Sequence, residues 1–97
     1  MPIMTRPDDL AASAGRRLAD VRKALGLSQR ELAKAITVSS GSIGNWEAGE
    51  RTPDITAMLR LRAKFGVTTD YIYAGSMIGL PGDIQAKILT IQSNRTA

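Results

Sequence analysis

The side chains of this 97-residue chain that could do chemistry are hydroxyls, amides, carboxylates and cations, because it contains neither histidine nor cysteine. Histidine is the commonest general base and metal ligand, and cysteine supplies nucleophiles, thiolate ligands and disulfides. Their absence argues against catalysis and leaves binding as the chemistry to look for. We therefore expect no enzyme activity, no catalytic residue, no metal, no cofactor and no small-molecule substrate.

The polar groups suited to binding gather in two short stretches, SQRE at 28–31 and SSGSIGNWEAGER at 39–51. The first stretch is a capping-box pattern, in which Ser28 begins a helix and Glu31 closes the box. The second stretch offers short hydroxyl and amide side chains together with Arg51. A net charge of +4 favours a polyanionic partner, although weakly by itself.

The elements that position these stretches are all expected to be helices, because no segment alternates apolar and polar residues and no hairpin turn appears. Helix-start and helix-stop residues predict helices over 7–25, 28–37, 40–48, 53–65 and 69–74, and a last amphipathic helix from 81 onwards. In the fourth helix we expect Ile55, Met58 and Phe65 to face inward, with either Leu61 or Arg62. We expect the tail at 93–97 to fray.

The third of these helices has two different faces. Ile43 and Trp46 lie three residues apart and should anchor it in the core. Gly41 and Gly44 lie on the outward side, although each glycine costs a helix roughly 1 kcal/mol relative to alanine. The glycines are either tolerated surface residues or positions where another molecule approaches the backbone.

Three segments in this order, LADVRKALGLSQRELAKAI, VSSGSIGNWEAGERTP and LRLRAKFGVTTDYIYAG, resemble the phage Cro/repressor-like (lambda repressor-like) helix-turn-helix family. The resemblance runs from about Arg17 to Gly75. It implies an all-α, five-helix DNA-binding domain in residues 1–75, with a recognition helix at about 40–48. Residues 76–97 would add a loop and a C-terminal amphipathic helix that serves dimerisation or completes the core.

The resemblance also implies roles for individual residues. It places base-edge contacts on Ser40, Gly41, Ser42, Gly44 and Asn45, and phosphate contacts on Ser28, Gln29, Arg30, Ser39 and Arg51. It pairs Arg22 with Glu47 in a structural ion pair, unless both charges are solvated; Ser28 could equally be a cap alone. Asn45 is the one side chain suited to bidentate recognition of a base, so we expect few direct base contacts and some reading of DNA shape.

The function implied is that of a cytoplasmic, sequence-specific regulator of transcription that binds double-stranded DNA. We expect a repressor that acts as a homodimer on an inverted repeat, with Tyr71, Ile72, Ile84 and Ile88 at the dimer interface. The alternative is that the C-terminal helix folds back on its own body. An antitoxin, a restriction-modification controller, or a protein-interaction module that has lost DNA binding are the rival functions. No apolar run approaches the roughly 20 residues of a membrane span.

Overall fold

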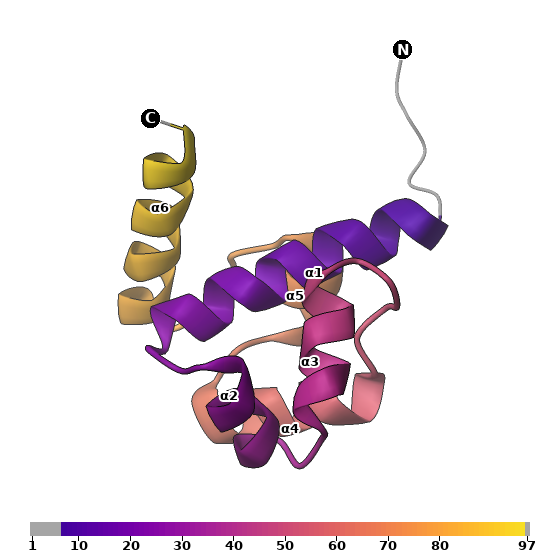
Figure 1. The fold of residues 1–97 in the computed structure, drawn as a ribbon. Coiled ribbons are helices and arrows are strands. Elements are labelled where there is room, and N and C mark those ends of the chain that lie inside the picture. Colours follow the sequence, from indigo (N-terminus) through magenta and orange to yellow (C-terminus); the bar gives the residue numbers. More distant parts are fainter. Residues whose placement is uncertain (1–6, 97) are drawn as a thin grey trace.

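The computed structural model describes residues 7–96, and the predicted all-helical fold is confirmed (Figure 1). Residues 1–6 of the predicted domain at 1–75, and residue 97 of the predicted C-terminal segment at 76–97, lie outside the described range. The helices are α1 (Pro7–Ala24), α2 (Gln29–Ala35), α3 (Ser40–Glu47), α4 (Ile55–Phe65), α5 (Thr69–Ala74) and α6 (Gly82–Thr96).

Side-chain caps explain where the short helices begin. The Oγ of Ser28 accepts from the Glu31 amide at 3.0 Å, and the Ser28 amide donates to Glu31 Oε1 at 2.8 Å, which completes the predicted capping box of α2. The side chains of Ser39, Asp54 and Thr68 likewise accept from the backbone amide three residues ahead and so cap α3, α4 and α5. Each cap satisfies a backbone N–H that has no partner inside its helix.

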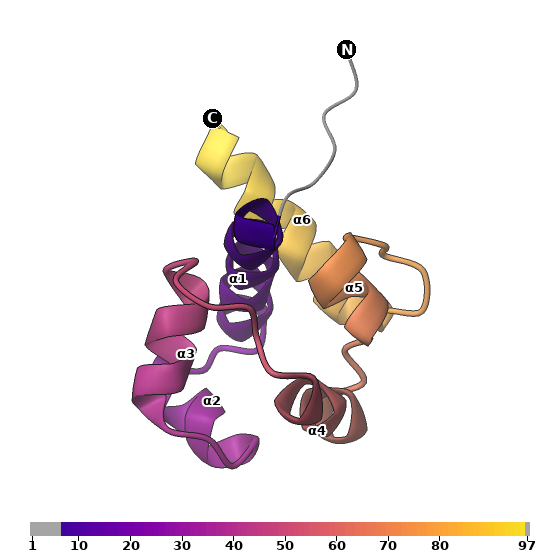
Figure 2. The same cartoon turned by 90° about the vertical axis from the view of Figure 1, so that its right-hand side faces the viewer.

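Helix α1 is the central element and contacts α3, α5 and α6, which surround it in Figure 2. Leu18 and Val21 on α1 are fully buried against residues from the other helices, including Ile43 and Trp46 of α3 as predicted. Gly15 lets α3 approach closely, because a β-carbon there would collide with the carbonyl oxygen of Trp46. The packing of α3 on α1 therefore requires glycine at this position, which sequence reasoning missed.

The inward face of α4 differs from the prediction at its first residue. Ala57, Met58 and Leu61 are buried, whereas Ile55 is 57% exposed. At 100° per residue, Ile55 lies about 100° around the helix from the centre of the buried stripe. The expectation that Ile55 faces inward was wrong.

The C-terminal segment forms α6 and packs on α1, which corrects the expectation about the tail. The tail does not fray at residue 93, because α6 continues to Thr96 and Arg95 binds the buried carboxylate of Asp20 at 2.9 Å and 3.2 Å. Ile84 and Ile88 are buried in the chain's own core, so α6 completes that core.

The predicted dimer interface is also corrected. Tyr71, Ile72, Ile84 and Ile88 have exposed fractions of 2%, 0%, 6% and 0%, so none of them is available at the surface. The physical reason is that α5 and α6 both pack on α1, so these apolar side chains are buried within one chain, which gains their transfer free energy without the cost of association.

Candidate nucleic-acid interface

The orientation of α3 is set by the pair that was expected from the resemblance, Arg22 and Glu47. Arg22 donates from Nε to Glu47 Oε2 at 2.7 Å and from Nη2 to Glu47 Oε1 at 3.0 Å. Its Nη1 also donates to the Leu27 carbonyl at 3.0 Å. The hydrogen bond to Glu47 raises the pKa of Arg22, while burial acts in the opposite direction. Arg22 therefore ties the end of α1, the following loop and the end of α3 together.

The outward face of α3 carries the residues expected at base edges, but not all of them are equally accessible. Ser40, Gly41 and Asn45 are exposed, whereas Ser42 and Gly44 are half-buried. Ser42 is occupied by the cap, since its amide donates to Ser39 Oγ at 3.0 Å and the two hydroxyls lie 2.9 Å apart. The accessible reading surface is accordingly small and carries no charge.

The glycines of α3 are not required by the fold. A β-carbon at Gly41 would lie 3.8 Å from Ser39 Oγ, and one at Gly44 would lie 3.8 Å from Gln29 Oε1, which are ordinary van der Waals distances. Alanine would therefore fit at both positions and would form the helix better. Steric contact with the rest of the fold therefore does not require glycine in place of alanine at either position.

The residues expected at phosphates lie on α2 and on the loops that flank α3. Ser28, Gln29, Arg30, Ser39 and Arg51 are all exposed. Ser28 is occupied by its capping box, whose hydrogen bonds lower the pKa of Glu31. Gln29 donates from Nε2 to Glu47 Oε1 at 3.0 Å, a contact between α2 and α3 that sequence reasoning missed.

The turn between α2 and α3 contains a second feature that the sequence does not reveal. Thr37 has a φ of 61°, in the left-handed region that β-branched residues rarely adopt. Arg60 of α4 donates from Nη1 to the carbonyls of Ile36 and Thr37, both at 3.3 Å. Arg60 thus satisfies carbonyls at the end of α2 and holds the turn that sets the angle between α2 and α3.

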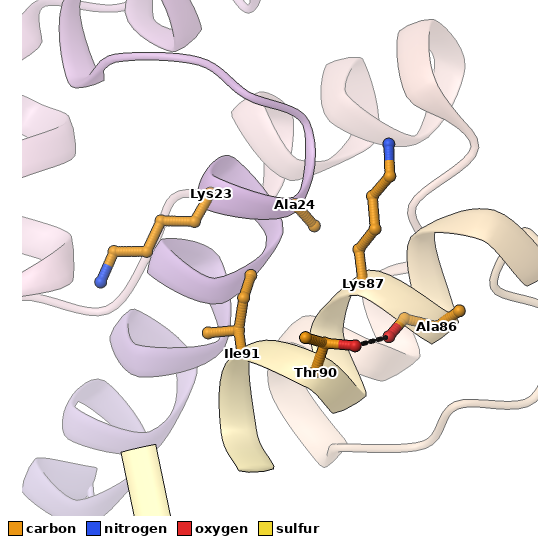
Figure 3. A pocket seen from close by; sticks show the side chains of 6 residues that line it. All are labelled: Lys23, Ala24, Ala86, Lys87, Thr90 and Ile91. Atoms are coloured by element: carbon orange, nitrogen blue, oxygen red, sulfur yellow. Dashed lines mark hydrogen bonds between the residues drawn. The ribbon is translucent and has the colours of Figure 1, made fainter. Parts of the chain in front are cut away.

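Two hollows lie on the surface of the described residues. One of about 330 Å³ lies between α1 and α6 and is lined by alkyl groups, two lysines and Thr90, whose hydroxyl donates to the Ala86 carbonyl at 3.1 Å (Figure 3). Another of about 260 Å³ contains Asp20 and Glu47, whose carboxylates are already in ion pairs. Within residues 7–96, no group of acidic residues could hold a metal ion, and no helix is long and apolar enough to cross a membrane.

Helices α2 and α3 are joined by the turn at Thr37 and pack against each other, and α3 packs on α1; this arrangement defines a helix-turn-helix protein. The chain belongs to the Cro/repressor-like helix-turn-helix family, whose helix-turn-helix model matches residues 18–72. No solved structure matches it significantly.

Three relatives come from Bacillus subtilis (strain 168). The chain is 33% identical to the HTH-type transcriptional regulator ImmR over 60 residues, which is 62% of this chain and 47% of ImmR. It is 31% identical over 62 residues to the SPbeta prophage-derived uncharacterized HTH-type transcriptional regulator YonR, or 64% of this chain and 57% of YonR. It is 32% identical over 72 residues to the uncharacterized HTH-type transcriptional regulator YobD, or 74% of this chain and 60% of YobD. The matched region thus spans only about half to three fifths of these relatives.

Proposed function

We propose that this protein is a sequence-specific regulator of transcription that inserts α3 into the major groove of double-stranded DNA. The observation that carries the proposal is the geometry of α3. The Arg22–Glu47 pair fixes the helix on α1 while Ser40, Gly41 and Asn45 remain exposed. The names of the three relatives support the regulatory role. Such a protein works in the cytoplasm, as a repressor where it occludes a promoter.

The proposed mode of recognition uses few direct base contacts. Asn45 can donate to and accept from adenine at the same time, which is worth about 1–3 kcal/mol of discrimination. Gly41 allows the backbone of α3 to approach the groove. The exposed cations Arg30 and Arg51 supply salt-dependent attraction to phosphates. Sequence-dependent DNA shape contributes the remaining specificity.

The test is a gel-shift titration with DNA from upstream of the protein's own gene, over a series of salt concentrations. Asn45→Ala should reduce the preference for one sequence by about 1–3 kcal/mol and retain binding at low salt. The matched control is Asn94→Ala, because Asn94 is exposed on α6 and lies outside the proposed interface. No retardation at low salt, where even nonspecific binders hold DNA, would refute the function and favour a protein-interaction module.

We further propose that the protein binds DNA as a homodimer, through a surface other than the one expected from the sequence. Ile55 and Leu59 are 57% and 51% exposed and lie one turn apart on α4, which makes them an apolar pair for a second copy. Leu59→Glu should therefore shift sedimentation toward the monomer, keep the helical circular-dichroism signal at low temperature, and lower the thermal midpoint because the stabilising partner is lost. Leu89→Glu is the matched control, because Leu89 is 49% exposed on α6. A monomeric wild type at micromolar concentration would refute the dimer.

A further inference from the structure

The carboxylate of Glu47 joins three helices. Besides its two bonds with Arg22 of α1, its Oε1 accepts a hydrogen bond from Gln29 Nε2 of α2 at 3.0 Å. The Arg22 contact is largely buried, with exposed side-chain fractions of 15% for Arg22 and 9% for Glu47, whereas Gln29 is exposed. One residue at the end of the recognition helix thus connects the interior anchor with a surface amide.

This contact leaves a defined set of hydrogen-bonding groups on Gln29. A side-chain amide has two N–H donors and one carbonyl acceptor. One N–H is used by Glu47, and the carbonyl oxygen lies beside Gly44, 3.8 Å from the position of a β-carbon there. The second N–H has no partner in the described part of the chain. It is held in place and remains available to an acceptor from outside.

Gly44 provides the space in which this amide lies. Alanine would fit at ordinary contact distance, and among the described residues outside α3 the one atom within 4 Å of its β-carbon is Gln29 Oε1, so a longer side chain would compete with the Gln29 amide for space. The missing side chain of Gly44 therefore has a consequence within the protein, because it lets Gln29 of α2 lie along α3 as far as Glu47.

We propose that Glu47 is a positioning residue for DNA binding, which holds the Gln29 amide beside Gly44 so that its second N–H donates to a phosphate oxygen. This inference rests on the proposed function. A single N–H donor suits a phosphate oxygen, because that oxygen only accepts hydrogen bonds. A contact of this kind positions the protein on DNA and carries no sequence information. Because Glu47 orients the amide before DNA arrives, less side-chain freedom is lost on binding.

The test is a double-mutant cycle in DNA affinity at one salt concentration. Gln29→Ala should weaken binding roughly tenfold, the size of one charge-assisted hydrogen bond. Glu47→Ala should weaken binding more in the wild type than in the Gln29→Ala background, because part of its effect passes through Gln29. Gln92→Ala on α6 is the matched control for loss of a glutamine. Equal losses from Glu47→Ala in both backgrounds would show that Glu47 acts only through Arg22, and would overturn the inference.

A second variant keeps the inference testable if Glu47→Ala does not fold. Gly44→Leu retains both partners of the Arg22–Glu47 pair but displaces Gln29, so it should cost affinity in the wild type and little in the Gln29→Ala background. An equal loss in both backgrounds would mean a direct clash with DNA, against the inference. In the free protein, NMR should show that one N–H of the Gln29 side-chain amide is protected from exchange with solvent. Gly44→Leu should remove this protection, and Gly44→Ala should retain it.

The two proposals fail in different ways. If the wild type binds specifically and Gln29→Ala binds equally well, the positioning role is wrong and the regulatory function stands. If the wild type does not bind DNA at all, both proposals fall.

Discussion

Replacing Gly15 by alanine should destabilise the protein, although the same change at most helical positions is stabilising. In a helix interior, glycine to alanine gains roughly 0.5–1 kcal/mol. At Gly15 the added β-carbon would collide with the Trp46 carbonyl oxygen and lie 3.0 Å from its carbonyl carbon and 3.4 Å from Glu47 Cα. These are backbone atoms, so α1 and α3 must separate as rigid bodies.

The size of the effect follows from two opposing terms. Overpacking of a well-packed interior costs typically 1–3 kcal/mol and occasionally more. A collision with backbone belongs at the upper end, so the net loss after the propensity gain is about 2 kcal/mol. For a domain of this size each kcal/mol corresponds to about 4–8 °C, which gives a fall in the thermal midpoint of about 8–16 °C. Gly41→Ala is the matched control and should raise the midpoint by a few degrees.

The assay is thermal unfolding followed by circular dichroism, with the fluorescence of Trp46 as a local probe. Trp46 is the single tryptophan of the chain, so its emission reports directly on the α1–α3 contact. We expect Gly15→Ala to red-shift this emission below the unfolding transition and to weaken DNA binding, because α3 is displaced. A Gly15→Ala protein as stable as the wild type, or more stable, would refute the close approach of the two helices.

Three further predictions concern single side chains. Tyr73→Phe should lose about 1 kcal/mol in urea unfolding, because the Tyr73 hydroxyl donates to the Pro53 carbonyl at 2.7 Å. Tyr71→Phe should be neutral or stabilising, because the buried Tyr71 hydroxyl has no hydrogen-bond partner among residues 7–96. The lowered pKa of Glu31 implies stability that is present above its unfolded pKa of about 4.3 and lost as pH falls through the folded value. Glu31→Gln should keep the cap and weaken the fall of the urea midpoint at acid pH. A midpoint that falls with pH as steeply as in the wild type would contradict this prediction. Arg95→Ala should speed hydrogen exchange in the last turn of α6 and lower the thermal midpoint, since Asp20 is left buried without its partner. Unchanged exchange rates would contradict the role of the Arg95–Asp20 pair in holding the end of α6.

The helix boundaries and the family could be predicted because they depend on residues close together in the sequence. The capping box of Ser28 and Glu31 joins groups three residues apart, and the glycines that follow α4 and α5 adopt left-handed φ values of 77° and 81°. Such contacts form within one turn of chain and need no knowledge of the rest of the fold. The Arg22–Glu47 pair was reached only through the family resemblance, not from local physics.

The tertiary structure decided every contact that depends on how two helices sit against each other. Asp20 and Arg95 are 75 residues apart, and nothing local to either residue predicts their pairing. Likewise, the apolar stripe of α6 is equally suited to a partner and to the chain's own core, and only its packing on α1 chooses the core. Apolar periodicity specifies that a face is buried, whereas what covers it depends on the relative placement of whole helices.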